Sequence, residues 1–566
     1  MLTRLTVVAL LAGVAGAWYA LLPPRAGVST AVTEPRASPV RGAIHVHSLR
    51  SDGTGDMGTI AAAAARAGLD FVILTDHGDA TRPPDPPQYL EGVLCIDAVE
   101  LSTDNGHVVA LDLPRAPYPL GGEARDVLDD ISRLGAFSIA AHPGSPRAGL
   151  RWSAGGTELD GLEWLNADSE WRDESVWSLA RAVLTYPIRG TETLVSLLDR
   201  PTDTLGRWDV LSQRRRVVAL AGSDAHARIG FRSLGEPYDG GSSLHVPSYE
   251  RMFQAFSNAL PDITLSGDAV ADAQLVLAAI REGHVYSTID GLGGAAVMSF
   301  TAASGAETAV GGDTLPLDGP VTLRVEIEGP DTARIDLLKD GRLLQTSTGA
   351  ELEREVDAIA AVYRVEVVLP ASPGDPPVPW IVSNPIYVGR EVTATVAPNA
   401  RSDASGFAVQ YENGPASDWT IETSPASLGA LDVVTGADGM QLSLRYGLGG
   451  AASDDPFVAL VMPAGQAVDT YDRLMFTAGA DRPMRLSVQL RQPDGEAGER
   501  WHRSVYLDSS PRTISVFFDD LRASGVTSSP SPVLDEVEAV LFVVDTVNTP
   551  VGASGTLWID DVRYGR

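Results

Sequence analysis

Cysteine and lysine are almost absent from this chain of 566 residues, and each absence excludes a class of site. The one cysteine, Cys95, lies in the apolar stretch GVLCIDAVE, so an intrachain disulfide and a cysteine-based zinc cluster are both excluded. Lys339 is the one lysine, and 43 basic residues face 74 acidic ones, which gives a net charge of −31. Because broad capture of nucleic acid or of an anionic membrane requires a basic face, we expect no strong nucleic-acid binding.

The N-terminal segment is apolar. An uncharged run of 18 residues, Leu5–Leu22, follows one arginine and precedes Pro-Pro-Arg, as in a secretory signal. The residues AGA at 15–17 resemble a cleavage site, yet the run is also about as long as the shortest helix that spans a bilayer. A cleaved signal peptide and a membrane anchor both remain open for residues 1–25, and residues 26–40 predict a flexible linker. Either interpretation predicts an extracytoplasmic protein, membrane-anchored or secreted, with membrane contact through this segment only.

From residue 41 onward, short apolar runs alternate with helical patterns. AIHVH, the alanine-rich MGTIAAAAARAGL and DFVILTDHG predict a strand, a helix that ends at Gly68 and a second, parallel strand. GVLCIDAVE, HVVALDL, AFSIAAHPG, LDGLEWLN and RVVALAGSDAH predict further strands, and residues 172–215 predict a helix-rich stretch. This alternation is typical of an α/β fold with a mostly parallel sheet, open or closed into a barrel.

The pattern changes near residue 295. VTLRVEIEG alternates apolar and polar residues, and RIDLLKDGRLL predicts a hairpin that turns at Asp340-Gly341, so residues 295–392 predict a small β-sandwich. A polar linker over 393–405 leads to residues 406–566, in which MRLSVQLRQPDG, AVLFVVDTVN and GTLWIDDVRY predict strands of a larger all-β domain.

Most predicted strands of the α/β region end in a residue type that ligates metals. These residues are His45, His47, Asp76, His77, Glu100, His142, Asn166, Asp224 and His226. Strand alternation places His45 and His47 on one face, and ligands gather at the carboxyl ends of parallel strands. A single such residue predicts little, since SDG and HPG also form ordinary turns. Clustered polar groups are costly unless they are paired or metal-bound, so the joint pattern predicts a metal site.

Five features together resemble the PHP (polymerase and histidinol phosphatase) superfamily over roughly residues 41–290: HVHSLRSDG, ILTDHG, Glu100 after an apolar run, AAHPG and GSDAH. GSDAH and the downstream IVSNPIYV are also similar to the hydrolase branch that includes carbaryl hydrolase. The resemblance implies a distorted (β/α)7 TIM-like barrel at residues 41–294 with two or three divalent metal ions at its mouth. It also makes residues 295–392 an accessory, Ig-like sandwich.

The resemblance implies a ligand set. One ion is expected on His45, His47, Glu100 and Asp224; a second shares Glu100 and takes His107 and His142; a third takes Asp52, His77 and His226. Of these, the residues expected to act in catalysis are Asp52, His77, Glu100 and His226. His107 lies at the start of its predicted strand, where hydrogen bonding at the strand end is the alternative role.

This donor set suggests a chemistry. Imidazole and carboxylate suit Zn, Mn or Fe, and the sequence does not choose among them. Two close metal ions lower the pKa of a bridging water and clamp the oxygens of a displacement at phosphorus, which favours hydrolysis of a phosphomonoester or nucleotide-type phosphodiester. Arg147, Arg228 and Asn166 are candidate substrate-binding residues, with solvated surface positions as the alternative for the arginines. Asp76 either orients a ligand or caps a helix.

Two other functions remain open. The carbaryl-hydrolase resemblance allows a metallohydrolase of carboxylic esters, carbamates or amides. A non-catalytic protein that binds surface glycans is the third hypothesis, because GTLWIDDVRY resembles the last strand of jelly-roll modules of the galactose-binding-like type. In that domain Trp419, Trp501 and Trp558 either stack on a sugar or fill the core.

Overall fold

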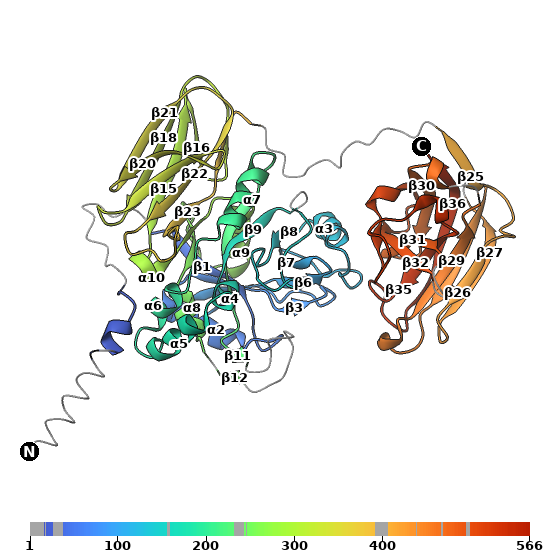
Figure 1. Ribbon diagram of the computed structural model, residues 1–566, viewed down its shortest axis with the longest axis horizontal. Coiled ribbons are helices and arrows are strands. Elements are labelled where there is room, and N and C mark those ends of the chain that lie inside the picture. Colours follow the sequence, from blue (N-terminus) through green and yellow to red (C-terminus); the bar gives the residue numbers. More distant parts are fainter. Residues whose placement is uncertain are drawn as a thin grey trace, which may run out of the picture. The chain divides into compact units, whose positions relative to one another are not determined.

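A computed structural model of the chain describes residues 16, 18–25, 38–155, 159–230, 243–244, 246–390, 406–436, 439–465, 468–493 and 498–566. The expected linker at 393–405, and most of the N-terminal apolar run and of the linker at 26–40, lie outside the described residues. Among the helices that are described, none is long and apolar enough to cross a membrane. The chain divides into two compact units (Figure 1). The first comprises Met1–Pro114 and Glu123–Val396, and the second Arg115–Gly122 and Ala397–Arg566.

Strands of the first unit close into a ring. Its members are β1 (Val40–Val46), β2 (Phe71–Leu74), β3 (His77–Gly78), β5 (Val93–Asp97), β6 (Val99–Thr103), β7 (Gly106–Leu111), β8 (Phe137–Ala140), β9 (Gly161–Asn166) and β10 (Val218–Ala225). β3 continues the line of β2, and β6 continues that of β5. Around the ring the order is β1, β2–β3, β5–β6, β7, β8, β9 and β10, which pairs with β1 again.

Neighbouring strands of the ring are parallel except at β7, which runs antiparallel to both β6 and β8. The cause is local, since only Asp104 and Asn105 connect β6 to β7. A parallel connection needs a crossover of a dozen residues or more, whereas two residues suffice for a hairpin. The start of β7 therefore lies at the edge where the parallel strands end, and this explains how a residue at a strand start can join a site at that edge.

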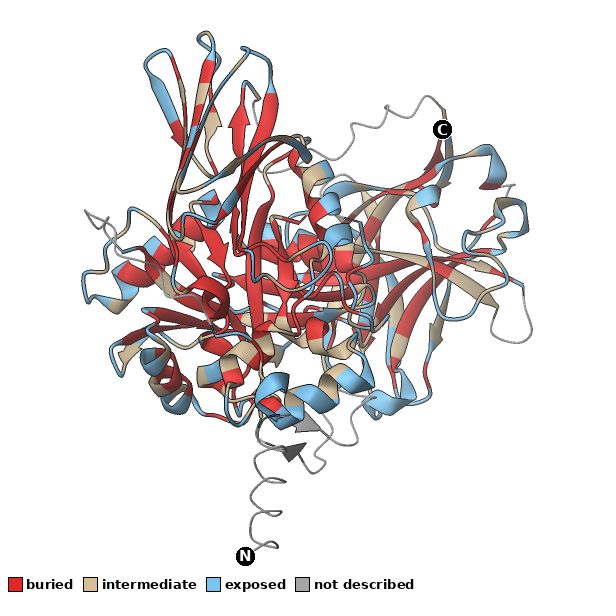
Figure 2. Cartoon of the chain, turned by 60° about the vertical axis from the view of Figure 1, so that its left-hand side comes forward, coloured by how far each residue is buried: buried red, intermediate tan, exposed pale blue. Residues whose placement is uncertain are grey.

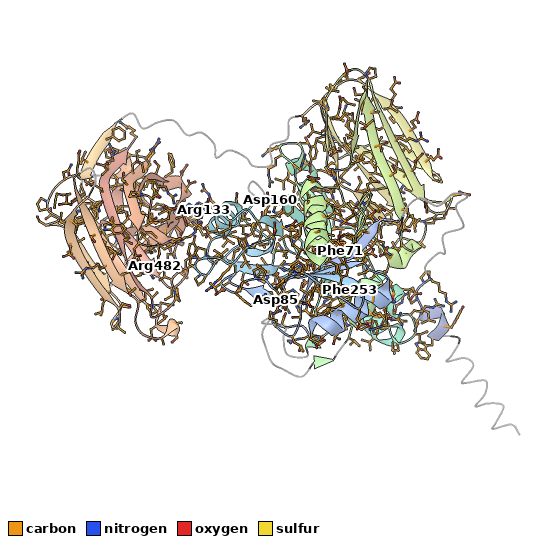
Figure 3. All side chains as sticks on the ribbon, turned by 180° about the vertical axis from the view of Figure 1, so that it is seen from behind. Phe71, Asp85, Arg133, Asp160, Phe253 and Arg482 are labelled. Atoms are coloured by element: carbon orange, nitrogen blue, oxygen red, sulfur yellow. The ribbon has the colours of Figure 1, made fainter. Side chains whose placement is uncertain are left out.

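The two faces of the ring strands bury different sets of apolar residues. Phe71 of β2 points inward with Ile44 and Val109, and this interior core includes Val276 of α9 (Ala269–Glu282). Phe253 of α8 (Tyr249–Phe253) belongs to a separate core that α2 (Met57–Ala67) builds against the outer face; Phe71 and Phe253 are labelled in Figure 3. Buried positions accordingly follow the strands in Figure 2.

Several local predictions for this unit are confirmed. The alanine-rich helix is α2, and Gly68 ends it with φ 76°. Cys95 is buried in the outer core. The helix-rich stretch at 172–215 contains α5 (Val176–Thr185), α6 (Gly190–Val195) and α7 (Thr202–Ser212). α4 (Ala167–Arg172) ends where this stretch begins, and α3 (Ala124–Arg133) and α10 (Asp290–Gly293) lie outside it. The remaining short strands are β4 (Gln88–Leu90), β11 (Ile229–Gly230) and β12 (Ser243–Leu244).

The small β-sandwich continues from the ring. One of its sheets contains β15 (Val297–Ser304), β16 (Glu307–Val310), β18 (Val321–Glu328) and β21 (Glu351–Val356). The other contains β17 (Thr314–Leu315), β19 (Arg334–Lys339), β20 (Arg342–Thr348), β22 (Ala361–Val368), β23 (Ile381–Ser383) and β24 (Ile386–Val388). β13 (Ser257–Leu260) and β14 (Tyr286–Thr288) link β1 to β23, so one sheet runs through both parts. The predicted hairpin at Asp340-Gly341 is confirmed, with Lys339 opposite Arg342.

Two amide side chains take the place of a neighbouring strand along β10. Asn384, from the motif SNPIYV, accepts from Ala219 N at 2.8 Å and donates to Ala219 O at 3.0 Å and to Val285 O at 2.9 Å. Asn258 of β13 makes the equivalent pair of bonds with the backbone of Ala221. Because an unpaired buried peptide group is costly, these side chains satisfy the stretch of β10 that β1 does not reach.

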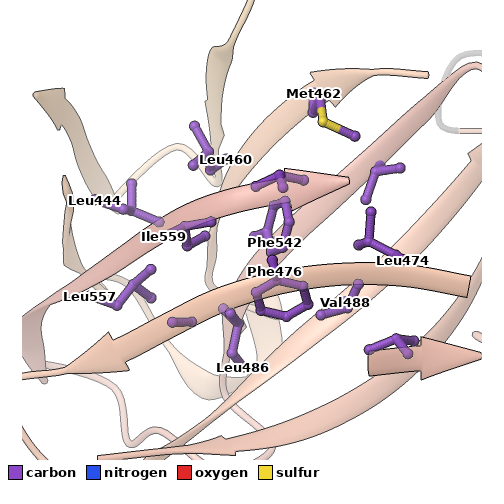
Figure 4. Packing of buried hydrophobic residues seen from close by; sticks show 14 of the residues in the cluster. Leu444, Leu460, Met462, Leu474, Phe476, Leu486, Val488, Phe542, Leu557 and Ile559 are labelled. Carbon is purple, nitrogen blue, oxygen red and sulfur yellow. The ribbon is translucent and has the colours of Figure 1, made fainter. Parts of the chain in front are cut away.

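The second unit is an all-β sandwich, as predicted. One six-stranded antiparallel sheet contains β25 (Phe407–Tyr411), β27 (Leu428–Thr435), β28 (Met440–Gly447), β30 (Arg473–Ala480), β33 (Arg512–Phe517) and β36 (Ser554–Gly565). The other contains β26 (Thr420–Thr423), β29 (Phe457–Pro463), β31 (Met484–Gln492), β32 (Glu499–Leu507), β34 (Arg522–Ala523) and β35 (Ala539–Asp545). Both sheets contribute to one core, in which Phe476 meets Phe542 edge to face (Figure 4).

The tryptophans of the second unit differ in burial. Trp501 is fully buried and donates from Nε1 to Ser529 O, and Trp419 stacks on Phe542 within the core. The sugar-stacking interpretation is therefore wrong for Trp419 and Trp501, which fill the core instead. Trp558 of β36 is half-buried.

We expect Asn384→Ala to destabilise the first unit, because the substitution removes three hydrogen bonds to buried peptide groups. The loss should be roughly 3 kcal/mol, given about 1–3 kcal/mol for each buried group left unsatisfied. Hydrogen exchange of the peptide that covers β10 measures it directly, and protection of Ala219 should fall. Thr348→Ala, at the exposed end of β20, is the control. Equal protection in Asn384→Ala and Thr348→Ala would contradict this role.

Candidate metal centre

The nine residues predicted as metal ligands meet at one edge of the ring. They are His45 in β1, His47 directly after it, Asp52 in the next loop, His77 in β3, Glu100 in β6, His107 in β7, His142 after β8, Asp224 in β10 and His226 after it. Four overlapping groups each bring one donor atom per residue within 4.8 Å of the others: His45, His47 and Asp224; His45, Glu100 and His142; His77, Glu100 and His107; and His47, Asp52, His77 and His226. His107 thus groups with His77 and His142 with His45, whereas the resemblance placed His107 and His142 in one set; Glu100 belongs to two groups, as expected of a shared ligand.

Three of these residues have a backbone conformation that non-glycine residues rarely adopt. The φ angles of His45, His142 and Asp224 are 65°, 32° and 44°. Such conformations persist only where the surrounding structure imposes them, and they concentrate at functional sites. The edge of the ring that carries the cluster is therefore under local backbone strain.

His45 reaches the cluster through a bulge rather than through regular alternation. Between Ile44 and Val46 the pairing advances by two residues on β1 but by one on β2, from Ile73 to Leu74, which leaves His45 as the extra residue opposite β2. Ile44 points into the interior core, and the bulge lets His45 follow it on the same side. Val46, between them, packs in the outer core, so His45 and His47 share one face as predicted, and their imidazole centroids are 5.1 Å apart.

The Glu100 carboxylate occupies the centre of the cluster and is 1% exposed. Its Oε1 lies 2.8 Å from His107 Nδ1 and 2.9 Å from His142 Nε2. Its Oε2 lies 3.2–3.3 Å from ring nitrogens of three further histidines, His45, His47 and His77. One carboxylate is therefore shared by five imidazoles, which is the arrangement expected of a bridging ligand.

The donors around Glu100 Oε2 fit a divalent cation. Nε2 of His45 and of His47 lies 3.3 Å from Glu100 Oε2 and 3.4 Å from Asp224 Oδ1. Metal–ligand bonds of about 2.0–2.1 Å in a tetrahedron give edges of about 3.3–3.4 Å. Both Nε2 atoms are buried and make no hydrogen bond of good geometry within the described part of the chain. Their spacing and their lack of partners match zinc or a metal of similar size.

Glu163, in the middle of β9, supports the cluster and was missed in the sequence. Its Oε1 lies 2.6 Å from His45 Nδ1, and its Oε2 accepts from His142 N at 2.7 Å and from Asn166 Nδ2 at 2.8 Å. A Cβ atom on Gly222 would lie 1.9 Å from Glu163 Oε1, so only glycine leaves room for this carboxylate. The signal was available, since LDGLEWLN carries a charged residue inside an apolar strand.

Backbone carbonyls fix the tautomers of two further histidines. His142 Nδ1 lies 3.0 Å from Leu150 O, and His226 Nδ1 lies 2.9 Å from Asp224 O. Because a carbonyl oxygen can only accept, each Nδ1 carries a proton, which leaves Nε2 as the ring nitrogen that a metal ion can bind. Both imidazoles are thereby preset as ligands through Nε2.

Asp76 shapes the loop that carries Asp52. It accepts from Ser48 N at 2.7 Å and from the hydroxyls of Ser48 and Ser51 at 2.6 Å. The strand β3 follows Asp76, so the helix-cap interpretation of this residue is wrong. Asp52 Oδ1 then lies 3.2 Å from His226 Nε2. The same oxygen lies 3.4 Å from His47 Nδ1 and 3.9 Å from His77 Nε2.

The pKa shifts follow from burial and from the shared carboxylates. Burial lowers the pKa of His77 to about 4, although Glu100 opposes the shift. Burial acts in the same direction on His47, but its contacts with Asp224 and Glu100 outweigh it and raise the pKa of His47 to about 10. Burial alone would raise the pKa of Glu100, but the imidazoles hold that pKa well below its usual range. The cluster therefore favours positive charge at its centre.

The three predicted substrate-binding residues have different surroundings. Asn166 accepts from Ser169 N at 3.1 Å, which caps α4, and it donates to Glu163, so its side chain supports the cluster. Arg147 is half-buried, and partial burial together with Arg172 lowers the pKa of its guanidinium. Arg228 is half-buried two residues after His226.

We expect Glu163→Gln to weaken zinc binding about 10- to 100-fold, as for other groups that orient a histidine ligand. The neutral amide cannot supply the negative charge that the Glu163 carboxylate holds beside His45 Nδ1. Competition with a coloured chelator measures the affinity in the full chain. Glu282→Gln, an exposed carboxylate at the end of α9, is the control, and equal affinities in the two variants would contradict the role of Glu163.

No protein-family model and no curated protein matches the chain. Solved structures that are similar to part of it include the family 11 carbohydrate-binding module of cellulosomal cellulase Lic26A-Cel5E of Clostridium thermocellum. That module is 18% identical, with a TM-score of 0.25, over 29% of this chain and 97% of the module. A family 30 carbohydrate-binding module is 12% identical over 28% of this chain and 88% of its own, with a TM-score of 0.21. An exo-beta-agarase is 12% identical over 28% of this chain and 25% of its own, with a TM-score of 0.20. At these TM-scores the likeness carries no conclusion about this chain.

Proposed function

We propose that the chain is a metal-dependent phosphoesterase that hydrolyses a phosphomonoester or a nucleotide-type phosphodiester. The observation that carries this proposal is the Glu100 carboxylate shared by five imidazoles, within a cluster of nine donors at one edge of the ring. The closed order of ring strands supports a distorted (β/α)7 TIM-like barrel of the PHP type, the family that the sequence motifs resemble.

Two or three divalent ions bound to this cluster would lower the pKa of water and stabilise the charge that develops on phosphoryl oxygens. The residues of the chain provide the frame for that chemistry. Glu163 and the carbonyls of Leu150 and Asp224 orient the imidazoles, and the strained backbone of the ring edge holds them in place. Because these groups are ordered before substrate arrives, little reorganisation is needed during the reaction.

The cluster has a closed side and an open side. His45 is fully buried, whereas His226 is 19% exposed. Substrate therefore approaches from the side of Asp52, His77 and His226, and Arg228 follows on the same segment. A chain with a net charge of −31 repels anions, so a phosphoester needs bound cations to reach this edge.

The test is metal content of the purified full chain, together with turnover of p-nitrophenyl phosphate, bis(p-nitrophenyl) phosphate and p-nitrophenyl acetate. We expect two or three metal ions per chain and phosphoester turnover that a chelator abolishes. The double variant His45→Ala/His47→Ala should lose more than about 100-fold in kcat/KM, the upper range for removal of an outer-shell partner.

The control variant is His284→Ala, whose imidazole pairs with Asp313 away from the cluster. If the full chain hydrolyses only p-nitrophenyl acetate, the proposed activity changes from phosphoester hydrolysis to ester hydrolysis at the same centre. A full chain that binds no zinc or manganese when both are supplied would refute a metal-dependent function.

A further inference from the structure

A cavity of about 700 Å³ adjoins the candidate metal centre in the first unit. Pro143 and Gly144, which follow His142, and Glu163 and Asn166, which support it, form the shared wall. The other walls come from α4 and from the first turn of α7. The volume lies within the range of small-molecule sites, about 300–1,000 Å³. A molecule bound at the cluster could therefore extend into this cavity.

Two buried polar atoms of the cavity wall make no hydrogen bond among the described residues. They are Trp164 Nε1, on a side chain 1% exposed, and Ser169 Oγ, on a side chain 7% exposed. A buried donor without a partner is costly and calls for an explanation. Both residues line the cavity, and a ligand oxygen would reach these two atoms after a small shift of the wall side chains.

The charges of the lining argue against a second anionic group. Three arginines, Arg151, Arg200 and Arg207, face five carboxyl groups. One arginine, Arg200, is held by Glu366 through bonds of 2.6 and 2.8 Å. Burial raises the pKa of Glu170 to about 8, so this carboxyl group is mostly protonated and neutral at pH 7. Donors and acceptors are therefore interleaved without an excess of cations, which suits hydroxyl groups, since each hydroxyl both donates and accepts.

We propose that this cavity binds a neutral polyhydroxylated group, a sugar or polyol, of the substrate whose phosphoryl group lies at the metal centre. The substrate class is then a sugar phosphate or polyol phosphate. This inference rests on the proposed function for the position of the phosphoryl group, but not for the binding of the polyol.

The first test compares glucose 6-phosphate, ribose 5-phosphate and glycerol 3-phosphate with p-nitrophenyl phosphate on the full chain. Ser169→Ala/Arg207→Ala should raise KM for at least one of the three about 10- to 100-fold, as expected for the loss of one neutral and one charged hydrogen bond. Turnover of p-nitrophenyl phosphate should change less than twofold. Arg214→Ala, an exposed arginine beyond the other end of α7, is the control. If the double variant affects all four substrates equally, the cavity does not bind the polyol.

The second test does not depend on turnover. Saturation-transfer NMR with glucose, ribose and glycerol should show binding to the full chain that Ser169→Ala/Arg207→Ala weakens and Arg214→Ala does not. Binding with this dependence but without any phosphoester turnover would retain the cavity and reject the proposed function. Phosphoester turnover without binding of any of the three probes, or binding unchanged in the double variant, would overturn the cavity proposal alone.

A different surface of the first unit carries a second inference. Helix α5 exposes a row of large apolar side chains, with Trp177 85% and Val183 74% exposed. Val176, Leu184 and Ile188 are exposed as well. Val176 and Val183 are seven residues apart, as are Trp177 and Leu184, so these four lie on one side of the helix, and Ile188 follows in the turn after it. Exposed apolar surface of this extent marks an interaction site.

The end of the N-terminal apolar run lies against this helix. Trp18 Nε1 donates to Leu184 O at 3.0 Å, and Arg181 Nε donates to Leu21 O at 2.9 Å. The Arg189 guanidinium lies 5.8 Å from the centroid of the Tyr19 ring. Trp18, Tyr19 and Leu21 are themselves exposed. Residues 18–21, near the end of the apolar run Leu5–Leu22, therefore contact the folded unit beside the exposed apolar row of α5.

We infer that α5 and residues 18–22 lie together in the interface of a lipid bilayer. Tryptophan, tyrosine and arginine beside exposed aliphatic side chains are typical of that interface. In the sequence, residues 18–22 end the uncharged run Leu5–Leu22, which is about as long as the shortest helix that spans a bilayer. Membrane contact thus extends beyond the N-terminal segment, to which the sequence had confined it.

The test uses a nitroxide on Val183→Cys in the full chain, bound to vesicles of phosphatidylcholine and phosphatidylglycerol. Cys95 is buried and its pKa is raised to about 11 by burial, so the introduced thiol reacts selectively. The label at residue 183 should become accessible to oxygen and shielded from a polar nickel complex. The control is Val270→Cys, 56% exposed on α9, where the label should remain in water.

Three outcomes would overturn this inference. One is a full chain that does not bind the vesicles, and another is a label at residue 183 that remains as accessible to nickel as the label at residue 270. The third is spin–spin broadening at residue 183 that grows with protein concentration without lipid, which would identify a second copy of the chain as the partner.

Discussion

The arrangement of the first unit depends on one shared carboxylate. Glu100 is buried among imidazoles from strands that are far apart in the sequence, and its two oxygens face two sides of the cluster. A buried charge is tolerated only when it is compensated, so each histidine must arrive at a fixed position. The bulge at His45, the positive φ angles and the glycine opposite Glu163 are the local means by which the ring meets that requirement.

Much of this could be read from the chain, because the evidence lay in spacing. Residues that end apolar runs meet at one edge of a parallel sheet, and that rule brought together His77, His142 and Asp224. The rule failed for β7, where the turn at Asp104-Asn105 reverses the strand and carries His107 to the same edge. It also missed Glu163, since strand position alone does not tell which interior carboxylate a distant histidine will contact.

The class of each domain could be predicted from the sequence, but the pairing of strands between distant parts of the chain could not. The alternation of strands and helices and the later β-rich composition gave the α/β region and the all-β domain. Continuity of one sheet from β1 through β13 and β14 into the small sandwich depends on long-range pairing that no local pattern encodes. The burial of Trp419 and Trp501 likewise depends on which face of a strand meets the opposite sheet.

The amide side chains that complete β10 make the ring and the small sandwich mechanically interdependent. Asn384 belongs to the sandwich, yet it satisfies both peptide groups of Ala219 in ring strand β10, three residues before Gly222, which pairs with Ile44 of β1. Side chains rather than a neighbouring strand pair with these peptide groups. Separating the small sandwich from the ring would therefore leave buried peptide groups without hydrogen-bond partners. The small sandwich is thus not an exchangeable module, because the ring and the sandwich form one cooperative unit and neither is complete without the other.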